Sequence, residues 1–187
     1  MAQTHGGAMD TDDVVVLLKQ QHQQIKSLFA RVESGTGDER RGAFRDLVRL
    51  LAVHETAEEE VVHPAARKAF EGGEQVVGDR LREEREAKEL LRDLDRMDPD
   101  DPDFMPKLRS LRQAVLAHAE AEEQYEFPQL NEHTDPARLA RMAKAVRAAE
   151  AAAPTHPHPG MESRAANLAA GPFAAVADRV RDALGRS

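Results

Sequence analysis

Residues 51–64 read LAVHETAEEEVVHP, and residues 116–128 read LAHAEAEEQYEFP. Each stretch sets a histidine and a glutamate four residues apart within an apolar helical pattern: His54 with Glu58, and His118 with Glu122. Side chains at this spacing lie on one face of an α-helix, one turn apart. Because that face is the apolar one, the two motifs predict imidazole and carboxylate groups inside a helical core.

The sequence around these motifs predicts four long helices separated by short breaks. The breaks are rich in Gly, Pro and Asp and fall at residues 33–38, 71–73, 97–102 and 131–136. The predicted helices cover about residues 12–35, 38–70, 75–97 and 103–130, with Pro64 as a kink in the second. Short connections between long helices make neighbours antiparallel, so we expect an all-α, up-down-up-down four-helix bundle.

The same breaks predict the domain organisation. We expect a disordered N-terminus in residues 1–11, the bundle in residues 12–133 and a C-terminal helical extension in residues 134–187. Within the extension, residues 154–160 (PTHPHPG) form a Pro- and His-rich linker, which is typical of an extended spacer. The extension is the candidate surface for a protein partner.

The composition limits the chemistry that this core can carry. The chain of 187 residues contains no Cys, which excludes disulfides, thiolate ligands and cysteine nucleophiles, so any metal must be held by His and carboxylates. The net charge of -8 comes without a basic stripe and argues against a nucleic-acid partner. Without a long apolar run or a secretory signal, the expected location is cytoplasmic, with no membrane partner.

Every predicted helix carries ionisable residues where its apolar pattern calls for a hydrophobic side chain. Counted from the nearest turns at a rise of about 1.5 Å per residue, they fall at one level of the bundle to within about one helical turn. Burying unpaired charge is costly, so the cluster needs a compensating partner. Neutral imidazole and carboxylate suit iron, manganese or zinc, and six ligands exceed the needs of one ion. The predicted two-metal ligands are His22, His54, Glu58, Glu84, His118 and Glu122.

Together with QQHQQIKSLF (residues 20–29), the two quoted stretches resemble the hemerythrin HHE cation-binding family over about residues 12–130. The resemblance implies a cofactor of two iron ions, usually oxo- or hydroxo-bridged, that binds or reacts with oxygen, peroxide or nitric oxide. It also implies that Glu58 and Glu122 bridge the ions. The residues that match family ligand positions are His22, His54, Glu58, His118 and Glu122.

The third helix departs from the family pattern. Where the family usually has a histidine before a K-x-L-L run, this chain reads EEREAKELL (residues 83–91), which places Glu84 at that position. The apolar stripe independently selects Glu84 as the inward residue. If Glu84 is a ligand, the set of three His and three Glu is closer to that of oxygen-activating ferritin-like proteins than to that of oxygen carriers. The alternative is that Lys88, one turn on, pairs with Glu84 and keeps it from the metal.

Two further residues bear on the site. Tyr125 lies about two turns beyond His118 on the same face, so it is either an additional ligand or, as we prefer, an aromatic core residue. His63 lies nine residues after His54, which in a regular helix is the opposite face, and we expect a packing role for it.

The sequence is compatible with two classes of function. The first is a di-iron protein whose partners are small molecules (oxygen, peroxide or nitric oxide) and which acts as a sensor, scavenger or detoxifier. Within this class, a catalase-like, peroxide-consuming activity and a non-enzymatic role are both open. The second is a metal-free helical interaction module in which the His and Glu residues form a buried polar network. No catalytic triad, P-loop or dinucleotide fingerprint is present.

Overall fold

The computed structural model describes residues 13–152, which form helices joined by short turns. The bundle has four long helices. The first is α1 (Val14–Ser34), and the third is α4 (Gly73–Asp95). The second consists of α2 (Gly37–Ala57), η1 (Glu58–Val62) and α3 (His63–Ala69), and the fourth consists of α5 (Phe104–Ala121), η2 (Glu122–Glu126) and α6 (Phe127–His133). An additional helix, α7 (Pro136–Ala152), follows. The expectations for residues 1–11 and for the part of the extension beyond residue 152, including the linker at residues 154–160, lie outside the described residues.

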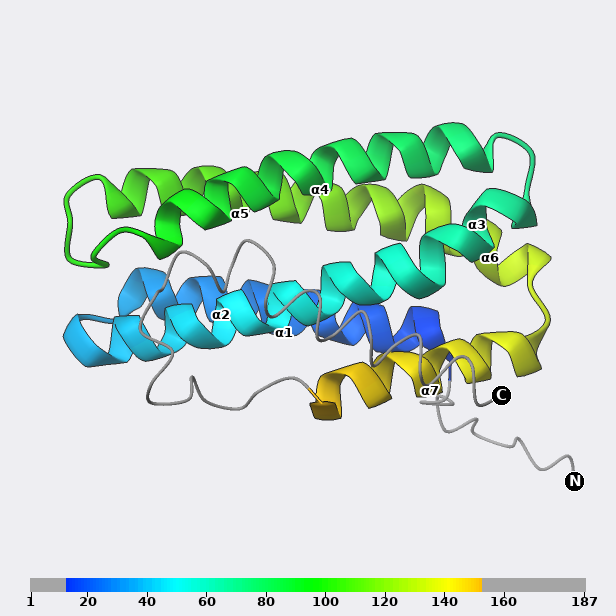
Figure 1. Ribbon diagram of the computed structural model, residues 1–187, viewed down its shortest axis with the longest axis horizontal. Coiled ribbons are helices and arrows are strands. Elements are labelled where there is room, and N and C mark those ends of the chain that lie inside the picture. The colour runs from blue at the N-terminus through cyan, green and yellow to red at the C-terminus, as the bar shows by residue number, and fades with distance from the viewer. Residues whose placement is uncertain (1–12, 153–187) are drawn as a thin grey trace, which may run out of the picture.

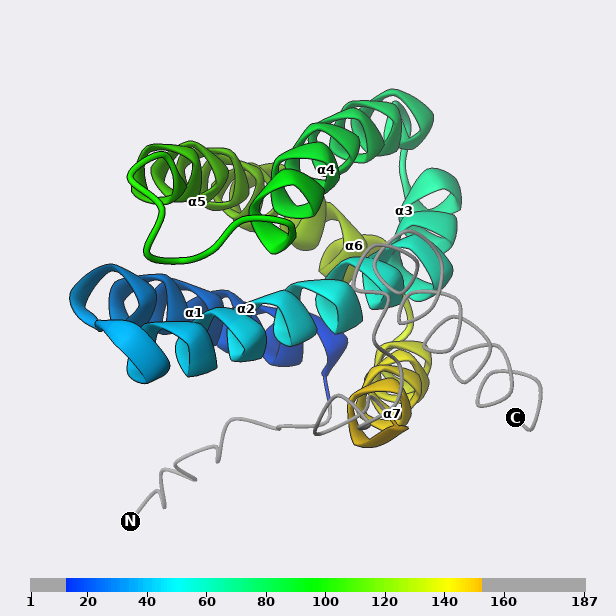
Figure 2. The same ribbon diagram turned by 60° about the vertical axis from the view of Figure 1, so that its left-hand side comes forward.

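The long helices pack as two pairs, and α7 lies against one of them. Helix α1 contacts mainly α2, α4 contacts mainly α5, and α7 contacts both α1 and α2 (Figures 1 and 2). This arrangement confirms the all-α class and the four-helix bundle with an additional C-terminal helix. None of the helices in residues 13–152 is long and apolar enough to cross a membrane.

The N-terminal end of α1 follows from its capping residues. The carboxylate of Asp13 accepts a hydrogen bond from the backbone N–H of Val15 at 2.7 Å, which satisfies one of the free donors at the start of the helix. At the other end, the N–H of Gly35 donates to the carbonyl of Arg31 at 2.9 Å. The helix therefore begins and ends within about two residues of the predicted boundaries.

Both helices that carry a His-x-x-x-Glu motif contain a π-helical turn, and each turn begins at the glutamate of the motif. In both, a proline follows six residues later: Pro64 after Glu58, and Pro128 after Glu122. A proline within a helix donates no N–H and its ring crowds the carbonyl four residues earlier, which a wider turn relieves. The predicted kink at Pro64 thus takes the form of a π turn, a feature that often accompanies functional sites.

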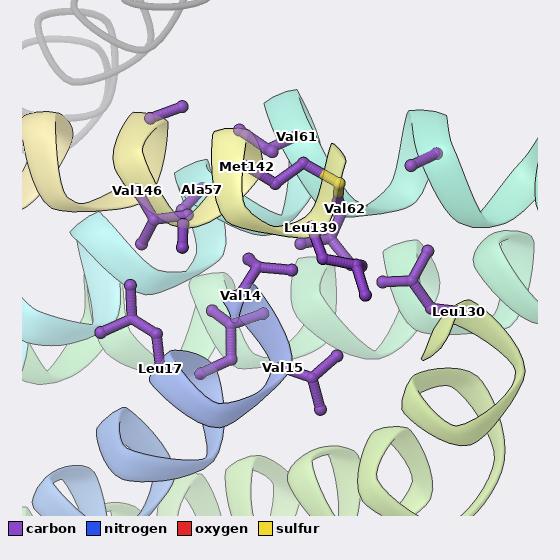
Figure 3. Close-up of a cluster of buried hydrophobic side chains, with 14 of the residues drawn as sticks. Val14, Val15, Leu17, Ala57, Val61, Val62, Leu130, Leu139, Met142 and Val146 are labelled. Atoms are coloured by element: carbon purple, nitrogen blue, oxygen red, sulfur yellow. The ribbon is translucent and has the colours of Figure 1, made fainter. Parts of the chain in front are cut away.

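Two apolar clusters fill the bundle on either side of the histidines. Along α1, Leu18 belongs to one cluster and Ile25 to the other, and His22 lies between them. The first cluster includes residues of α7, whose Met142 and Val146 pack towards Val14 and the second long helix (Figure 3). The apolar packing therefore encloses a single polar level within the bundle.

Candidate metal centre

The structure brings the six predicted ligands together in the middle of the bundle. All six are buried, and they come from all four long helices. Their ligand atoms form two groups, in each of which the atoms lie within 4.8 Å of one another. The first group contains His22, His54, Glu58 and Glu122, and the second contains Glu58, Glu84 and His118.

The carboxylate of Glu58 belongs to both groups. Its Oε1 lies 3.2 Å from Nε2 of His54, while its Oε2 lies 3.8 Å from Nε2 of His118. The carboxylate of Glu122 is placed in the same way, with Oε2 3.3 Å from Nε2 of His22 and Oε1 3.4 Å from Nε2 of His118. Each of these two glutamates therefore directs one oxygen to each side of the site.

The three histidines share one orientation. In each ring, Nε2 faces the shared carboxylates and Nδ1 lies within hydrogen-bond distance of an oxygen from a neighbouring side chain. Such a partner orients an imidazole and fixes which nitrogen is free to bind a metal. The pairs are His22 with Glu123 at 2.8 Å, His54 with Gln21 at 2.7 Å, and His118 with Glu83 at 3.1 Å.

The residues fit a bound cation because the site contains buried polar atoms without hydrogen bonds. Both carboxylate oxygens of Glu58 and of Glu122, one oxygen of Glu84 and Nε2 of His118 are buried and accept none. Buried carboxylate oxygens that accept no hydrogen bond are unfavourable, and a cation at the centre of the cluster would supply the missing interaction. The absence of sulfur from the donor set matches a borderline or hard metal.

The electrostatics of these side chains show the same need for positive charge. Burial raises the pKa of Glu58 to about 8, and the charge of nearby Glu122 adds to this effect. Burial also favours the neutral form of Glu122, but contacts with His118 and His22 outweigh it and hold the pKa of Glu122 well below its usual range. Burial lowers the pKa of His54 to about 3, so its ring is neutral at physiological pH.

Glu84 is oriented by a histidine rather than by a lysine. Its Oε1 lies 2.6 Å from Nε2 of His63, whereas its Oε2, which accepts no hydrogen bond, lies 3.8 Å from the Lys88 ammonium. The ammonium of Lys88 instead donates to Glu59. The alternative considered from the sequence, a direct Glu84–Lys88 pair, is therefore present only as a longer contact, and Glu84 stays within reach of Glu58 and His118.

The expected packing role of His63 on the opposite face is wrong. His63 is buried, and its two ring nitrogens face Glu84 and, at 3.1 Å, Glu126. The π turn between His54 and His63 rotates the chain less per residue than an α-helix does, so His63 comes round towards the interior. In the sequence, Pro64 predicted a kink in this helix, but it did not predict which way the kink would turn the His63 side chain.

The preferred interpretation of Tyr125 as a core aromatic is also wrong. Its side chain is 66% exposed, and it lies within the second π turn, where Glu126 takes the inward position. The structure therefore does not bring Tyr125 to the six clustered residues. Both corrections have one cause, because both residues follow the start of a π turn.

A small pocket opens beside the histidines. It has a volume of ≈ 20 Å³, which is room for about one water-sized molecule. His22, His54 and His118 line it on the polar side, and Ile25, Leu51 and Val115 line it on the apolar side. Glu55 and Glu84 also line the pocket, so it opens directly onto the clustered side chains.

Comparisons with known proteins identify the family of this chain. The family model of the hemerythrin HHE cation binding domain matches residues 13–130. An uncharacterized hemerythrin-like protein of Schizosaccharomyces pombe is 29% identical over 167 residues, which cover 87% of this chain and 82% of that protein. A DNA nickase of Nostoc is 27% identical over 124 residues, which cover 65% of this chain but only 34% of the nickase.

A solved structure shows the same fold. The crystal structure of a hemerythrin HHE cation binding domain-containing protein from Mycobacterium kansasii superposes with a TM-score of 0.66 and 21% sequence identity. The superposition covers 89% of this chain and 98% of that one. Because the family model spans well over half of the chain, this protein belongs to the hemerythrin HHE cation-binding domain family.

Proposed function

We propose that this protein holds two iron ions in the bundle and uses them to react with oxygen, peroxide or nitric oxide as a sensor, scavenger or detoxifier. The observation that carries the proposal is the orientation of the three histidines. Each Nδ1 is held by an oxygen of a neighbouring side chain, and each Nε2 faces carboxylate oxygens that accept no hydrogen bond. A polar network built for its own stability would pair those oxygens.

Two ions fit the site better than one. Glu58 is common to both groups of ligand atoms, and Glu122 reaches the histidines of both sides. Two-metal carboxylate sites in helical bundles are built in this way, with glutamates shared between the ions. Iron is the proposed metal because the donors are nitrogen and oxygen only and because the family resemblance implies it.

The chain's own residues bind, orient and enclose the metals. Three imidazoles and three carboxylates make the ligand set, and the two apolar clusters keep bulk water from it. Bound iron supplies the redox chemistry towards oxygen, peroxide or nitric oxide. The third carboxylate, Glu84, adds negative charge that favours the ferric state, so reactivity with peroxide is more consistent with this site than reversible oxygen carriage.

Iron content and optical spectra test the proposal. After anaerobic loading with ferrous iron and removal of the excess, elemental analysis should give close to two irons per chain, and peroxide, oxygen and nitric oxide should each be tried for a change in the visible spectrum. One iron or fewer, with all six side chains intact, contradicts the two-metal site. No iron at all, in a folded protein, favours the metal-free interaction module.

A further inference from the structure

A hydrogen-bonded chain connects α7 to the candidate metal centre. Nε2 of Gln21 lies 2.6 Å from Oε1 of Glu150, and Oε1 of Gln21 lies 2.7 Å from Nδ1 of His54. Gln21 is buried in α1, and Glu150 is half-buried in the last turns of α7. The chain therefore runs from the C-terminal extension, through one amide, to a ring of the ligand set.

The carboxylate of Glu150 determines the direction of every hydrogen bond in this chain. An ionised carboxylate only accepts hydrogen bonds, so the NH₂ group of Gln21 must face Glu150. The amide oxygen of Gln21 then faces His54 and can only accept, so Nδ1 of His54 must carry the proton. That tautomer leaves the lone pair of His54 on Nε2, the nitrogen that faces Glu58 and His22.

We propose that Glu150 is a positioning residue for the metal centre, which acts through Gln21 to hold His54 in the tautomer that binds metal through Nε2. The effect on metal binding rests on the proposed function, but the effect on the tautomer does not. Because Glu150 lies beyond residues 13–130, which the family model covers, the extension completes a site that the family domain carries. The competing explanation is that α7 only covers apolar surface, through side chains such as Leu139 and Met142.

The variant Glu150→Gln separates these explanations because it keeps the shape of the side chain. A glutamine at position 150 offers either an acceptor or a donor, so the Gln21 amide is free to flip and to present its NH₂ group to His54. In the metal-free protein, ¹⁵N resonances of the histidine rings should show His54 as a single Nδ1–H tautomer in the wild type and as a mixture in Glu150→Gln. Lys144→Ala, on an exposed part of α7, is the control and should leave the ring unchanged.

The double variant Gln21→Glu with Glu150→Gln is the rescue. It exchanges the amide and the carboxylate. The carboxylate at position 21 now accepts a hydrogen bond from Nδ1 of His54, and the amide at position 150 donates a hydrogen bond to that carboxylate. Iron affinity should fall about 10-fold or more in Glu150→Gln, as is typical when a partner of a metal-bound histidine is lost, and should return in the double variant. If α7 only packed against the bundle, the single and the double variant would have the same iron affinity, because both keep the apolar side chains of α7.

Each result decides between the proposals. A single His54 tautomer in Glu150→Gln, or equal iron affinity in wild type, single and double variants, overturns the role of Glu150 while leaving the iron site intact. If the wild type binds no iron but the tautomer shifts in Glu150→Gln, the proposed function fails, while the control of the His54 tautomer by Glu150 stands. Loss of iron in the single variant without recovery in the double variant also overturns the positioning role.

Discussion

The imidazole Nε2 of His63, in α3, lies 2.6 Å from Oε1 of Glu84, in α4, and both side chains are buried. The other ring nitrogen faces Glu126, so one histidine serves two buried carboxyl groups. Burial opposes protonation of this ring, but the carboxylates of Glu126 and Glu84 outweigh it and raise the pKa of His63 to about 10. His63 is therefore a cation at physiological pH and compensates part of the negative charge of the site.

Replacing His63 by leucine should destabilise the protein strongly. The change leaves Glu84 and Glu126 without their partner in a dry interior, and breaking a buried pair in this way typically costs about 3–5 kcal/mol. Denaturant unfolding of the metal-free protein measures the change in the free energy of unfolding. His133→Gln is the matched control, because His133 is exposed at the end of α6, and it should change stability by less than about 0.5 kcal/mol. A His63→Leu protein as stable as the control contradicts the charged pair.

The stability of the metal-free protein should fall as the pH rises from 8 to 10. The pKa of His63 is raised from its ordinary 6.5 to about 10, so its stabilising effect is complete below about pH 6.5 and is lost as the pH rises through 10. Each proton that the folded protein holds more tightly contributes at most about 1.4 kcal/mol per pH unit. His118 adds to the decline, because Glu122, Glu58 and Glu83 outweigh its burial and raise its pKa well above the usual value. The buried carboxyl groups of Glu55 and Glu58, with pKa values of about 8, contribute mainly at lower pH. Denaturation curves should therefore show a decline between pH 8 and 10 in the wild type and a flatter profile in His63→Leu.

Glu58→Gln should remove both irons, not one. Its two oxygens serve both groups of ligand atoms, and an amide cannot bridge two cations as a carboxylate does. Elemental analysis after iron loading should give well below one iron per chain. Glu59→Gln is the control from the next position, since Glu59 pairs with Lys88 rather than with the ligand set, and it should keep about two irons. Retention of one tightly bound iron in Glu58→Gln would contradict the bridging assignment.

Tyr125→Phe should leave the iron content and the visible spectrum unchanged. With 66% of its side chain exposed, Tyr125 lies outside the enclosed site, so removing its hydroxyl changes no contact of the ligands. A phenolate bound to ferric iron gives an intense visible band, and the spectrum of the loaded variant tests for it directly. A bleached variant would show that the helix rearranges on metal binding to bring Tyr125 inward.

The fold and the six clustered residues were predictable because they depend on periodicity. The spacing of apolar residues predicted four helices. Residues such as His22 and Glu84 stood out because they are ionisable and occupy positions where that spacing calls for an apolar side chain. His63 and Tyr125 were misplaced because a regular helix was assumed through the two π turns, which change the phase of every later residue.

The residues that orient the histidines were not predicted for a different reason. Glu83 and Glu123 lie in acidic stretches, and their contacts with His118 and His22 depend on how neighbouring helices meet. Gln21 and Glu150 are 129 positions apart, and only the packing of α7 onto the bundle brings them into contact. A single sequence contains no signal for such a pair.

Glu84→His tests the departure of this chain from the family pattern. The variant should keep two irons, because imidazole at position 84 supplies the more usual ligand, and it should make the irons easier to reduce, because one negative charge is lost. Spectroelectrochemical titration measures the reduction potential, and elemental analysis measures the iron. Glu84→Ala is the contrasting variant: it opens a coordination position, so its reaction with peroxide should change.

The contact between Glu84 and His63 also affects the stability of the Glu84→His variant. In the wild type, His63 is held by Glu84 on one side, so a histidine at position 84 faces a ring that is charged in the metal-free protein. Two imidazoles in contact cannot both stay protonated at low cost, so the unloaded Glu84→His protein should be less stable than the wild type and should regain stability on binding iron. Thermal unfolding with and without iron measures this difference. Iron content and potential equal to those of the wild type in Glu84→His, Glu84→Ala and Glu84→Gln alike would show that Glu84 does not bind iron and serves only His63.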